Sequence, residues 1–293
     1  MKVTVGVWGC GVVGSNTARM FEEFTNEIEI LRYDKFKKGD WSSTNEMIER
    51  SDFIFLCLPS PMQDEDGSVD LFYIDIALKE ISLQLKRGTF KTIIIRSTVV
   101  PGSCDNFAKK YKNLSIVHMP EFLVESDPWK AILECEKVII GADNYQAFFS
   151  IYKLMYEVYK DKIRYVYLTR KEAEMYKYAC NTLLTMNVLV ANEIYNICQC
   201  LDISYRSIQR YLKFDSRLCT HTLVPGPDGD FGVGGKCLPK DVNALCHCAE
   251  QNGYTPELIR KGLQFNNIIR NNKDWLIIPG AVSSCDFIDE DKK

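Results

Sequence analysis

Short apolar runs alternate with longer stretches of mixed polarity over the first 168 residues. The runs are VTVGV, EIEILRY, DFIFLCL, TIIIRS, LSIVH, KVIIG and IRYVYL. Their length and β-branched content favour strands, and strands that alternate with amphipathic helices form a parallel sheet with helices on both faces. The pattern therefore predicts an α/β domain over residues 1–168.

The character of the sequence changes after Thr169. Residues 170–200 contain no Gly or Pro and place apolar side chains at helical spacing, which predicts one long helix. A Gly- and Pro-rich loop at 224–235 is followed by helical segments that begin near Pro239 and Pro256. We expect a mainly α-helical central domain at 169–275 and a short C-terminal tail at 276–293.

Composition narrows the classes of function. The 293 residues carry 36 basic and 39 acidic side chains, a net charge of -3, with no basic stripe, so nucleic acid is not an expected partner. No apolar run approaches the roughly 20 residues that cross a bilayer, and the start MKVTVGVWG lacks the features of an export signal. We expect a cytoplasmic protein of two domains with no membrane partner.

The twelve cysteines are spread along the whole chain, several within apolar strand or helix patterns, which is typical of reduced, buried thiols. The pairs Cys198/Cys200 and Cys246/Cys248 lack the two-residue gap of zinc knuckles. We therefore predict no metal site.

A glycine motif suggests a cofactor. Gly9, Gly11 and Gly14 follow the first expected strand and open a helix, as in the dinucleotide fingerprint of Rossmann-type domains. The turn, which also contains Cys10, Val12 and Val13, would bring backbone N–H groups to a pyrophosphate. A glycine-rich turn without a ligand is the alternative.

Asp34 lies twenty residues after Gly14, at the end of the second expected strand. A carboxylate there can accept hydrogen bonds from ribose hydroxyls and repels a 2'-phosphate, which favours NAD over NADP. Lys35, Lys37 and Lys38 follow and would weaken that repulsion.

Two segments of the second domain contain candidate catalytic side chains. Lys177 and Asn181 are four residues apart on the long helix and share a face, although a solvated Lys is the common alternative. Cys237 precedes Pro239 at an expected helix start, where the helix dipole with Lys236 and Lys240 would lower the thiol pKa. A buried, inert cysteine is the alternative.

Carboxylates complete the set. Asp241, four residues after Cys237, returns to the same side of its helix. Glu121 and Glu125 in HMPEFLVES follow the fifth expected strand, where loops at the carboxyl ends of a parallel sheet meet the ligand cleft. Either Glu could activate water, and either could equally be a surface residue.

Taken in order, five blocks resemble the UDP-glucose and GDP-mannose dehydrogenase family: GCGVVG, STVVPG, PEFLVES, EMYKYACN and GGKCLPKD, within residues 1 to about 272. The resemblance implies two successive hydride transfers to NAD and a covalent thioester on Cys237. It further implies a homodimer or higher oligomer. UDP-glucose is the first expected substrate and GDP-mannose the alternative.

The resemblance also implies residue roles. Cys237 would be the nucleophile; Lys177 and Asp241 would handle the proton of the alcohol and stabilise the oxyanion, with Asn181 donating to the same oxygen. Glu121 and Thr98 would position or activate the hydrolytic water. Further contacts are implied for Pro59, Thr98 and Glu125 with the cofactor, and for Phe122, Leu123, Gly234 and Arg217 with the substrate, Arg217 from a neighbouring subunit.

Three departures from the family pattern keep other functions open. The stretch from Asp34 to Asp52 is short, the loop at 224–235 is long, and the sequence ends after the linking helix, where the family continues into a C-terminal domain. The alternatives are a truncated homologue that binds NAD without chemistry, and a simple hydroxyacid dehydrogenase, which needs no covalent intermediate.

Overall fold

The computed structural model describes residues 2–37, 42–124, 126–212, 214–215, 218 and 221–283. The chain divides into two compact units. The first comprises Met1–Ser60 and Leu71–Lys177, and the second comprises Pro61–Asp70 and Tyr178–Lys293.

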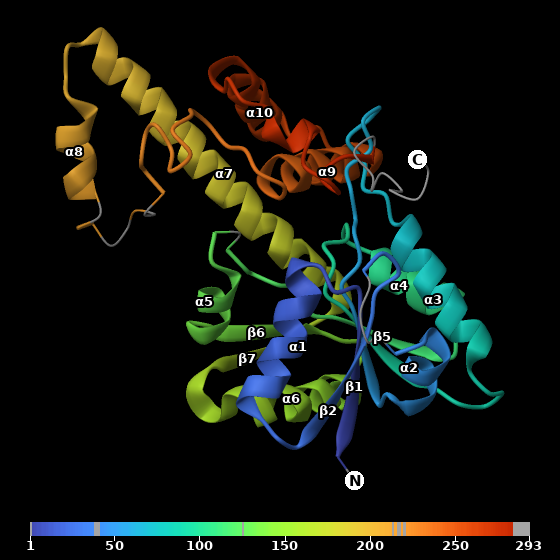
Figure 1. Cartoon of the computed structure of the whole chain (residues 1–293). Helices are drawn as coiled ribbons and strands as arrows, with labels where there is room; N and C mark the ends of the chain where they lie inside the picture. Colours follow the sequence, from blue (N-terminus) through green and yellow to red (C-terminus); the bar gives the residue numbers. More distant parts are fainter. Residues whose placement is uncertain are drawn as a thin grey trace. The chain divides into compact units, whose positions relative to one another are not determined.

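A seven-stranded sheet forms the centre of the first unit, in the order β2-β1-β3-β4-β5-β6-β7 (Figure 1). Each strand coincides with one of the seven apolar runs, which confirms the strand predictions. Their bounds are β1 Val3–Trp8, β2 Ile28–Tyr33, β3 Phe53–Leu56, β4 Lys91–Ile95, β5 Leu114–His118, β6 Lys137–Gly141 and β7 Arg164–Leu168.

The sheet is parallel except at one junction. β1 to β5 pair in parallel, and β6 pairs in parallel with β7. β5 and β6 run antiparallel and are paired only through His118 and Gly141. The predicted parallel sheet is thus confirmed, with a reversed pair of strands at one edge.

Helices cover both faces of this sheet (Figure 1). One face carries α1 Val12–Phe24, α5 Pro128–Leu133 and α6 Tyr145–Tyr159, and the other carries α2 Thr44–Arg50, α3 Phe72–Gln84 and α4 Ser103–Lys110. Successive strand residues point to opposite faces of the sheet. In β4, Ile94 packs in the core on the α1 side, whereas Ile93 and Ile95 pack in the core on the α3 side. A sheet buried on both faces explains why its strands are almost continuously apolar.

The long helix α7, Arg170–Cys200, has 31 residues and confirms the prediction for 170–200. Residues 170–177 of this helix belong to the first unit and residues 178–200 to the second, which also contains α8 Tyr205–Leu212, α9 Leu238–Gln251 and α10 Glu257–Ile269. α9 and α10 begin where Pro239 and Pro256 predict, and their facing side chains Val242, Cys246 and Leu263 form a small core. The second unit is therefore mainly helical, as expected.

Residues 61–70 join the second unit although they follow β3 in sequence. The Met62 N–H donates to the Ala281 carbonyl at 2.9 Å, and the Ser283 N–H donates to the Met62 carbonyl at 2.8 Å. Met62 packs with Trp275, Ala281 and Val282 in a separate apolar cluster. This long-range pairing ties the loop to the last described residues.

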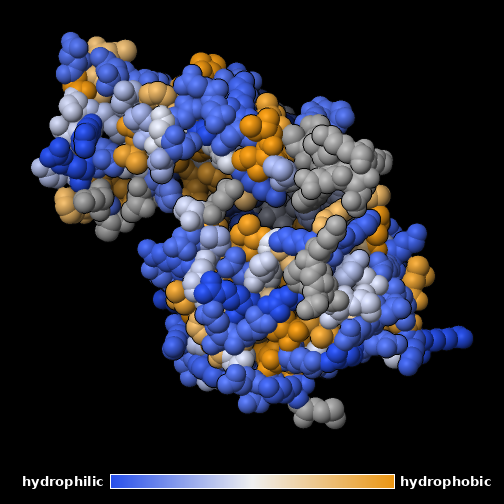
Figure 2. Space-filling view, in the orientation of Figure 1, coloured by the Kyte–Doolittle hydropathy of each residue, from blue (hydrophilic) through white to orange (hydrophobic). Residues whose placement is uncertain are grey.

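The face drawn in Figure 2 is mostly hydrophilic, with hydrophobic residues exposed in places. Within the described ranges, no helix is both long enough and apolar enough to cross a bilayer.

Candidate functional site

The turn after β1 has the backbone that the glycine motif predicts. Gly9 has a φ of +93°, and a Cβ there would lie 2.6 Å from the Cys57 carbonyl oxygen. A Cβ on Gly14 would lie 1.8 Å from the Gly9 carbonyl oxygen, so α1 packs directly on the turn. Neither position accepts a side chain without backbone movement.

The N-terminus of α1 is open to a ligand. Its N-cap residue is Gly11, which supplies no side-chain cap, and Gly11 and Val12 are exposed while Val13 is half-buried. A Cβ on Gly11 would meet nothing within 4 Å. The side chain of Cys10 is buried, so that residue offers only its backbone. Uncapped N–H groups beside open space form a site for a phosphate group, and these residues fit a dinucleotide.

Asp34 is held by backbone donors. Its Oδ2 accepts from the Cys10 N–H at 2.7 Å, and its Oδ1 accepts from the N–H groups of Phe36 and Lys37 at 2.9 and 3.1 Å. A carboxylate offers about four lone-pair sites. One site on Oδ2 therefore stays available, so Asp34 can accept a hydrogen bond from one ribose hydroxyl.

The loops after β3 and β4 are linked to each other at the carboxyl ends of their strands. The Ser97 hydroxyl accepts from the Leu58 N–H at 3.0 Å and donates to the Leu58 carbonyl at 2.7 Å. Pro59 and Thr98, the neighbours of these two residues, are both half-buried. This link brings the two predicted cofactor-contact segments to one edge of the sheet.

Lys177 and Glu121 form a buried ion pair in the first unit. The Lys177 Nζ donates to the Glu121 carbonyl at 2.6 Å and lies 3.3 Å from Glu121 Oε1. Lys177 is only 5% exposed, so the alternative of a solvated surface Lys is wrong. The other carboxylate oxygen, Oε2, accepts from the Leu123 N–H at 2.6 Å. The Lys177 ammonium also lies 5.2 Å from the centre of the Phe122 ring.

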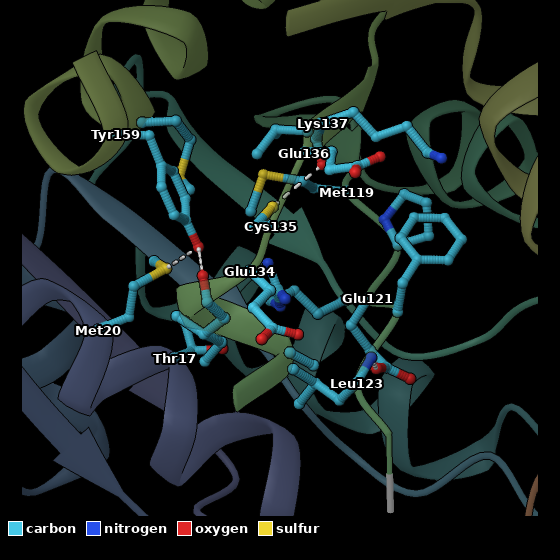
Figure 3. Close-up of a pocket in the computed structure, with 17 residues that line it drawn as sticks. Thr17, Met20, Met119, Glu121, Leu123, Glu134, Cys135, Glu136, Lys137 and Tyr159 are labelled. Carbon is cyan, nitrogen blue, oxygen red and sulfur yellow. Dashed lines mark hydrogen bonds between the residues drawn. The ribbon is translucent and has the colours of Figure 1, made fainter. Parts of the chain in front are cut away.

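A cavity of about 340 Å³ lies beside this pair (Figure 3). Glu121 and Leu123 line one side of it and Thr17, Met20 and Tyr159 the other. The Tyr159 hydroxyl donates to Met20 Sδ at 3.3 Å and lies 3.5 Å from the Ile132 carbonyl. Arg96, Glu134, Glu136 and Lys137 also line the cavity, so charged groups of both signs border it beside apolar side chains.

Asn181 and Asp241 meet in the second unit. The Asn181 Nδ2 donates to Asp241 Oδ2 at 2.6 Å, and both residues are buried. The Lys240 Nζ donates to Asp241 Oδ1 at 2.6 Å, with side chains only 6% and 1% exposed. Lys240, predicted to act as a flanking charge on the Cys237 thiol, is therefore a buried partner of Asp241.

Cys237 is exposed and is the N-cap residue of α9, with Pro239 in the first turn, as predicted. The Asp241 N–H donates to the Cys237 carbonyl at 2.9 Å, which places the two residues one turn apart. An accessible thiol at a helix N-terminus is in a setting that favours the thiolate.

The loop before Cys237 is held by residues that sequence reasoning missed. Asn266 accepts from the Val233 N–H at 2.8 Å and donates to its carbonyl at 3.1 Å. Asp274 accepts from the Gly235 N–H at 3.0 and 3.1 Å. Arg270 is paired with Asp228 at 2.7 Å, and a Cβ on Gly234 would lie 2.0 Å from its Nη2. In the sequence, the one sign of this role is that these polar residues lie on or just after the predicted helix that begins near Pro256.

Two predicted residues, Glu125 and Arg217, lie outside the described residues. The others form two groups. Gly9, Cys10, Gly11, Val12, Val13, Gly14, Asp34, Pro59, Thr98, Glu121, Phe122, Leu123 and Lys177 lie in the first unit, and Asn181, Gly234, Cys237 and Asp241 in the second. In the part of the chain that the structure describes, no cluster of three or more His, Cys, Asp or Glu side chains could hold a metal ion.

Two models of one family match the chain. The NAD binding domain of the UDP-glucose/GDP-mannose dehydrogenase family matches residues 29–163, and its central domain matches residues 171–268. The chain belongs to this family. Its first unit is thus the family's NAD-binding domain, with NAD as its cofactor.

The relatives of this dehydrogenase family member are distant. A UDP-glucose 6-dehydrogenase from Pseudomonas aeruginosa is 26% identical over 292 residues and is covered over 63% of its length, with 87% of this chain aligned. Similar enzymes from Rickettsia bellii and Rhizobium meliloti are each covered over 51% of their length. The chain therefore spans about half to two thirds of the length of these relatives.

Solved structures share the fold. A UDP-glucose dehydrogenase from Pyrobaculum islandicum aligns with a TM-score of 0.78 at 21% identity, over 92% of this chain and 68% of that one. A 3-hydroxyisobutyrate dehydrogenase from Mycobacterium tuberculosis aligns with a TM-score of 0.71 at 13% identity, over 92% of this chain and 94% of that one. At such identities the likeness concerns the fold alone.

Proposed function

We propose that the protein is an NAD-dependent nucleotide-sugar 6-dehydrogenase that oxidises UDP-glucose to UDP-glucuronate in two steps through a thioester on Cys237. The observation that carries the proposal is the exposed Cys237 thiol at the start of α9, one turn from the buried Asn181–Asp241 pair. Membership of the family and the names of the relatives support the reaction class and the first substrate.

NAD would be held by the Gly9–Gly14 turn, the open N-terminus of α1 and the free lone pair of Asp34. When bound, NAD supplies a hydride acceptor, and because each NAD accepts one hydride, the two oxidations would consume two NAD molecules in turn. The backbone N–H groups at α1 would bind the pyrophosphate, and the half-buried carboxylate of Asp34 would accept from the adenosine ribose.

The proton of the substrate alcohol needs an acceptor, and the oxyanion needs donors. Lys177 is fixed by Glu121 and can donate to the oxygen as negative charge develops, while Asn181 offers an amide donor. Asp241 accepts the proton directly or through water. The proposal requires these residues to act on the same bound sugar.

Cys237 carries the second oxidation. Its thiolate adds to the aldehyde carbon, and the aldehyde oxygen takes a proton to give a thiohemiacetal. Loss of a hydride from carbon and of that proton from oxygen gives the thioester. Water, positioned by Glu121 and Thr98, adds to the thioester carbonyl; the carbon–sulfur bond then breaks, which releases the carboxylate and restores the thiol.

A homodimer in the cytoplasm is part of the same proposal. Within the second unit an apolar stripe with helical spacing is exposed on α7, made of Leu183, Val190, Ile194 and Ile197, and Leu201 directly follows the helix. Exposed apolar stripes of this kind mark protein–protein contacts.

The proposal is tested by the number of NADH molecules released for each sugar nucleotide consumed. Purified protein supplied with UDP-glucose and excess NAD should release two NADH for each sugar consumed, and GDP-mannose should be assayed beside it. Cys237→Ser should arrest or severely slow the reaction at the aldehyde, whereas Cys200→Ser, at another exposed thiol, should not. A Cys237→Ser variant that completes turnover would indicate the hydroxyacid dehydrogenase alternative. Turnover of neither sugar nucleotide, with NAD still bound, would indicate a binding protein.

A further inference from the structure

Glu174 is a fully buried carboxylate on α7 that the proposed chemistry does not use. Its Oε1 accepts from the Cys104 N–H at 2.7 Å, and its Oε2 accepts from the Gly102 N–H. These donors lie at the start of α4, whose N-cap residue Gly102 supplies no side-chain cap. Glu174 therefore caps a helix that is 70 residues away in sequence, within the first unit.

The same face of α7 makes two similar attachments. Arg170, one turn earlier, donates to Asp105 of α4 at 2.7 Å and to Asp143 after β6 at 3.0 Å. Lys177, one turn later, donates to Glu121 after β5. Residues four and three apart share a helix face. The first turns of α7 thus bind the segments that follow β4, β5 and β6. The segments after β4 and β5 are among the predicted site segments.

We propose that Glu174 is a positioning residue, which fixes the segment from Ser97 to Cys104, and with it Thr98, to the part of α7 that carries Lys177. The inference rests on the proposed function, because only that function gives Thr98 a role. Two charge-assisted hydrogen bonds to one backbone turn restrain that turn more than neutral caps do. The fully buried position shields both bonds from competing water.

The charge of Glu174 changes near neutral pH. Burial raises its pKa from 4.5 to about 7, against the hydrogen bonds from Cys104 and Gly102, which lower it. Asp105 and Cys104 on α4 also act on Glu174, and Arg170 on α7 acts on Cys104. Because folding raises this pKa, the stability linked to it is fully present below pH 4.5 and is lost as the pH rises through about 7. The ionised form, in turn, binds the two N–H groups more strongly.

Glu174→Gln keeps the shape of the side chain and removes its charge. The matched control is Glu172→Gln, since Glu172 is exposed two residues away and bonds only Thr169. In Glu174→Gln the Gly102 and Cys104 amides should exchange hydrogen about ten to a hundred times faster, the worth of a hydrogen bond to a charged group. Turnover should fall in kcat with little change in KM, and the limb of its pH profile near 7 should disappear.

The pH dependence of hydrogen exchange in the wild-type protein is a second test, which needs no variant. After correction for intrinsic base catalysis, exchange of the Gly102 and Cys104 amides should become faster as the pH rises through about 7, because opening that exposes Glu174 lets its carboxylate ionise in water, while exchange in the sheet core stays constant. The proposal is overturned if the Gly102 and Cys104 amides exchange at the wild-type rate in Glu174→Gln. It is also overturned if they exchange faster in Glu174→Gln but its kcat and pH profile are the same as those of the control Glu172→Gln. Absence of wild-type turnover overturns the proposed function instead, and the exchange data then decide whether Glu174 fixes this segment.

Discussion

The buried pair Lys240–Asp241 allows a quantitative test of the second unit. Asp241→Asn removes the negative charge of a pair whose two side chains are almost inaccessible, and leaves the Lys240 ammonium unpaired. The new amide group also turns a donor toward either Lys240 or Asn181. Breaking a buried pair in this way costs about 3–5 kcal/mol of the free energy of unfolding.

A double-mutant cycle isolates the interaction. Lys240→Met alone leaves the Asp241 carboxylate with a single partner, Asn181, and should cost a similar amount. The double variant leaves no buried charge at this site, so its cost should be smaller than the sum by about 2–3 kcal/mol. Native-state hydrogen exchange of the α9 amides measures these free energies for the second unit.

The control is the pair Arg260–Glu250 in the same unit, whose side chains are about one-third exposed. The cycle of Arg260→Met and Glu250→Gln should give a coupling of at most about 1 kcal/mol. If the costs at Lys240 and Asp241 add within about 0.5 kcal/mol, the two charges do not depend on each other and the reasoning is refuted.

Two further predictions concern the glycine turn and α7. Gly14→Ala should lower the free energy of unfolding by about 1–3 kcal/mol and abolish NAD binding in calorimetric titration, because its Cβ meets the Gly9 carbonyl. Gly11→Ala, with open space around its Cβ, should cost under about 1 kcal/mol yet still weaken NAD binding; equal stability losses in the two variants would contradict this. Ile197→Glu should weaken self-association at least about tenfold in sedimentation, whereas Gln199→Glu, on another face of α7, should leave it unchanged; an unaffected dimer would exclude this stripe as the interface.

Local patterns predicted the elements of the fold well. β-branched runs such as TIIIRS became strands because both faces of the sheet are buried. The long helix followed from 31 residues without Gly or Pro. The reversed junction at β6 was missed because strand direction depends on the connection. The helix α5 has only six residues, about 9 Å, which is shorter than the adjacent strands and does not carry the chain back along the sheet.

The site was predicted in its motifs but not in its partners. Helical spacing placed Lys177 and Asn181 on one face of α7, yet Lys in isolation is usually exposed, and only the Glu121 partner explains its burial. Lys240 was interpreted as a charge for Cys237 because sequence proximity does not reveal which neighbour a side chain contacts. The Glu174 cap and the pairing of Met62 with Ala281 and Ser283 join residues far apart in sequence, beyond the reach of any local pattern.

The single backbone pairing between β5 and β6 creates a seam in the sheet. β4 and β5 pair along five residues, whereas only His118 and Gly141 join the two parts of the sheet across the seam. Apolar side chains such as Val117 and Ile140, together with α6, hold the parts together. Because so few backbone hydrogen bonds cross this seam, the segment β6–α6–β7 should unfold as one cooperative unit, at a lower free energy than the remaining five strands.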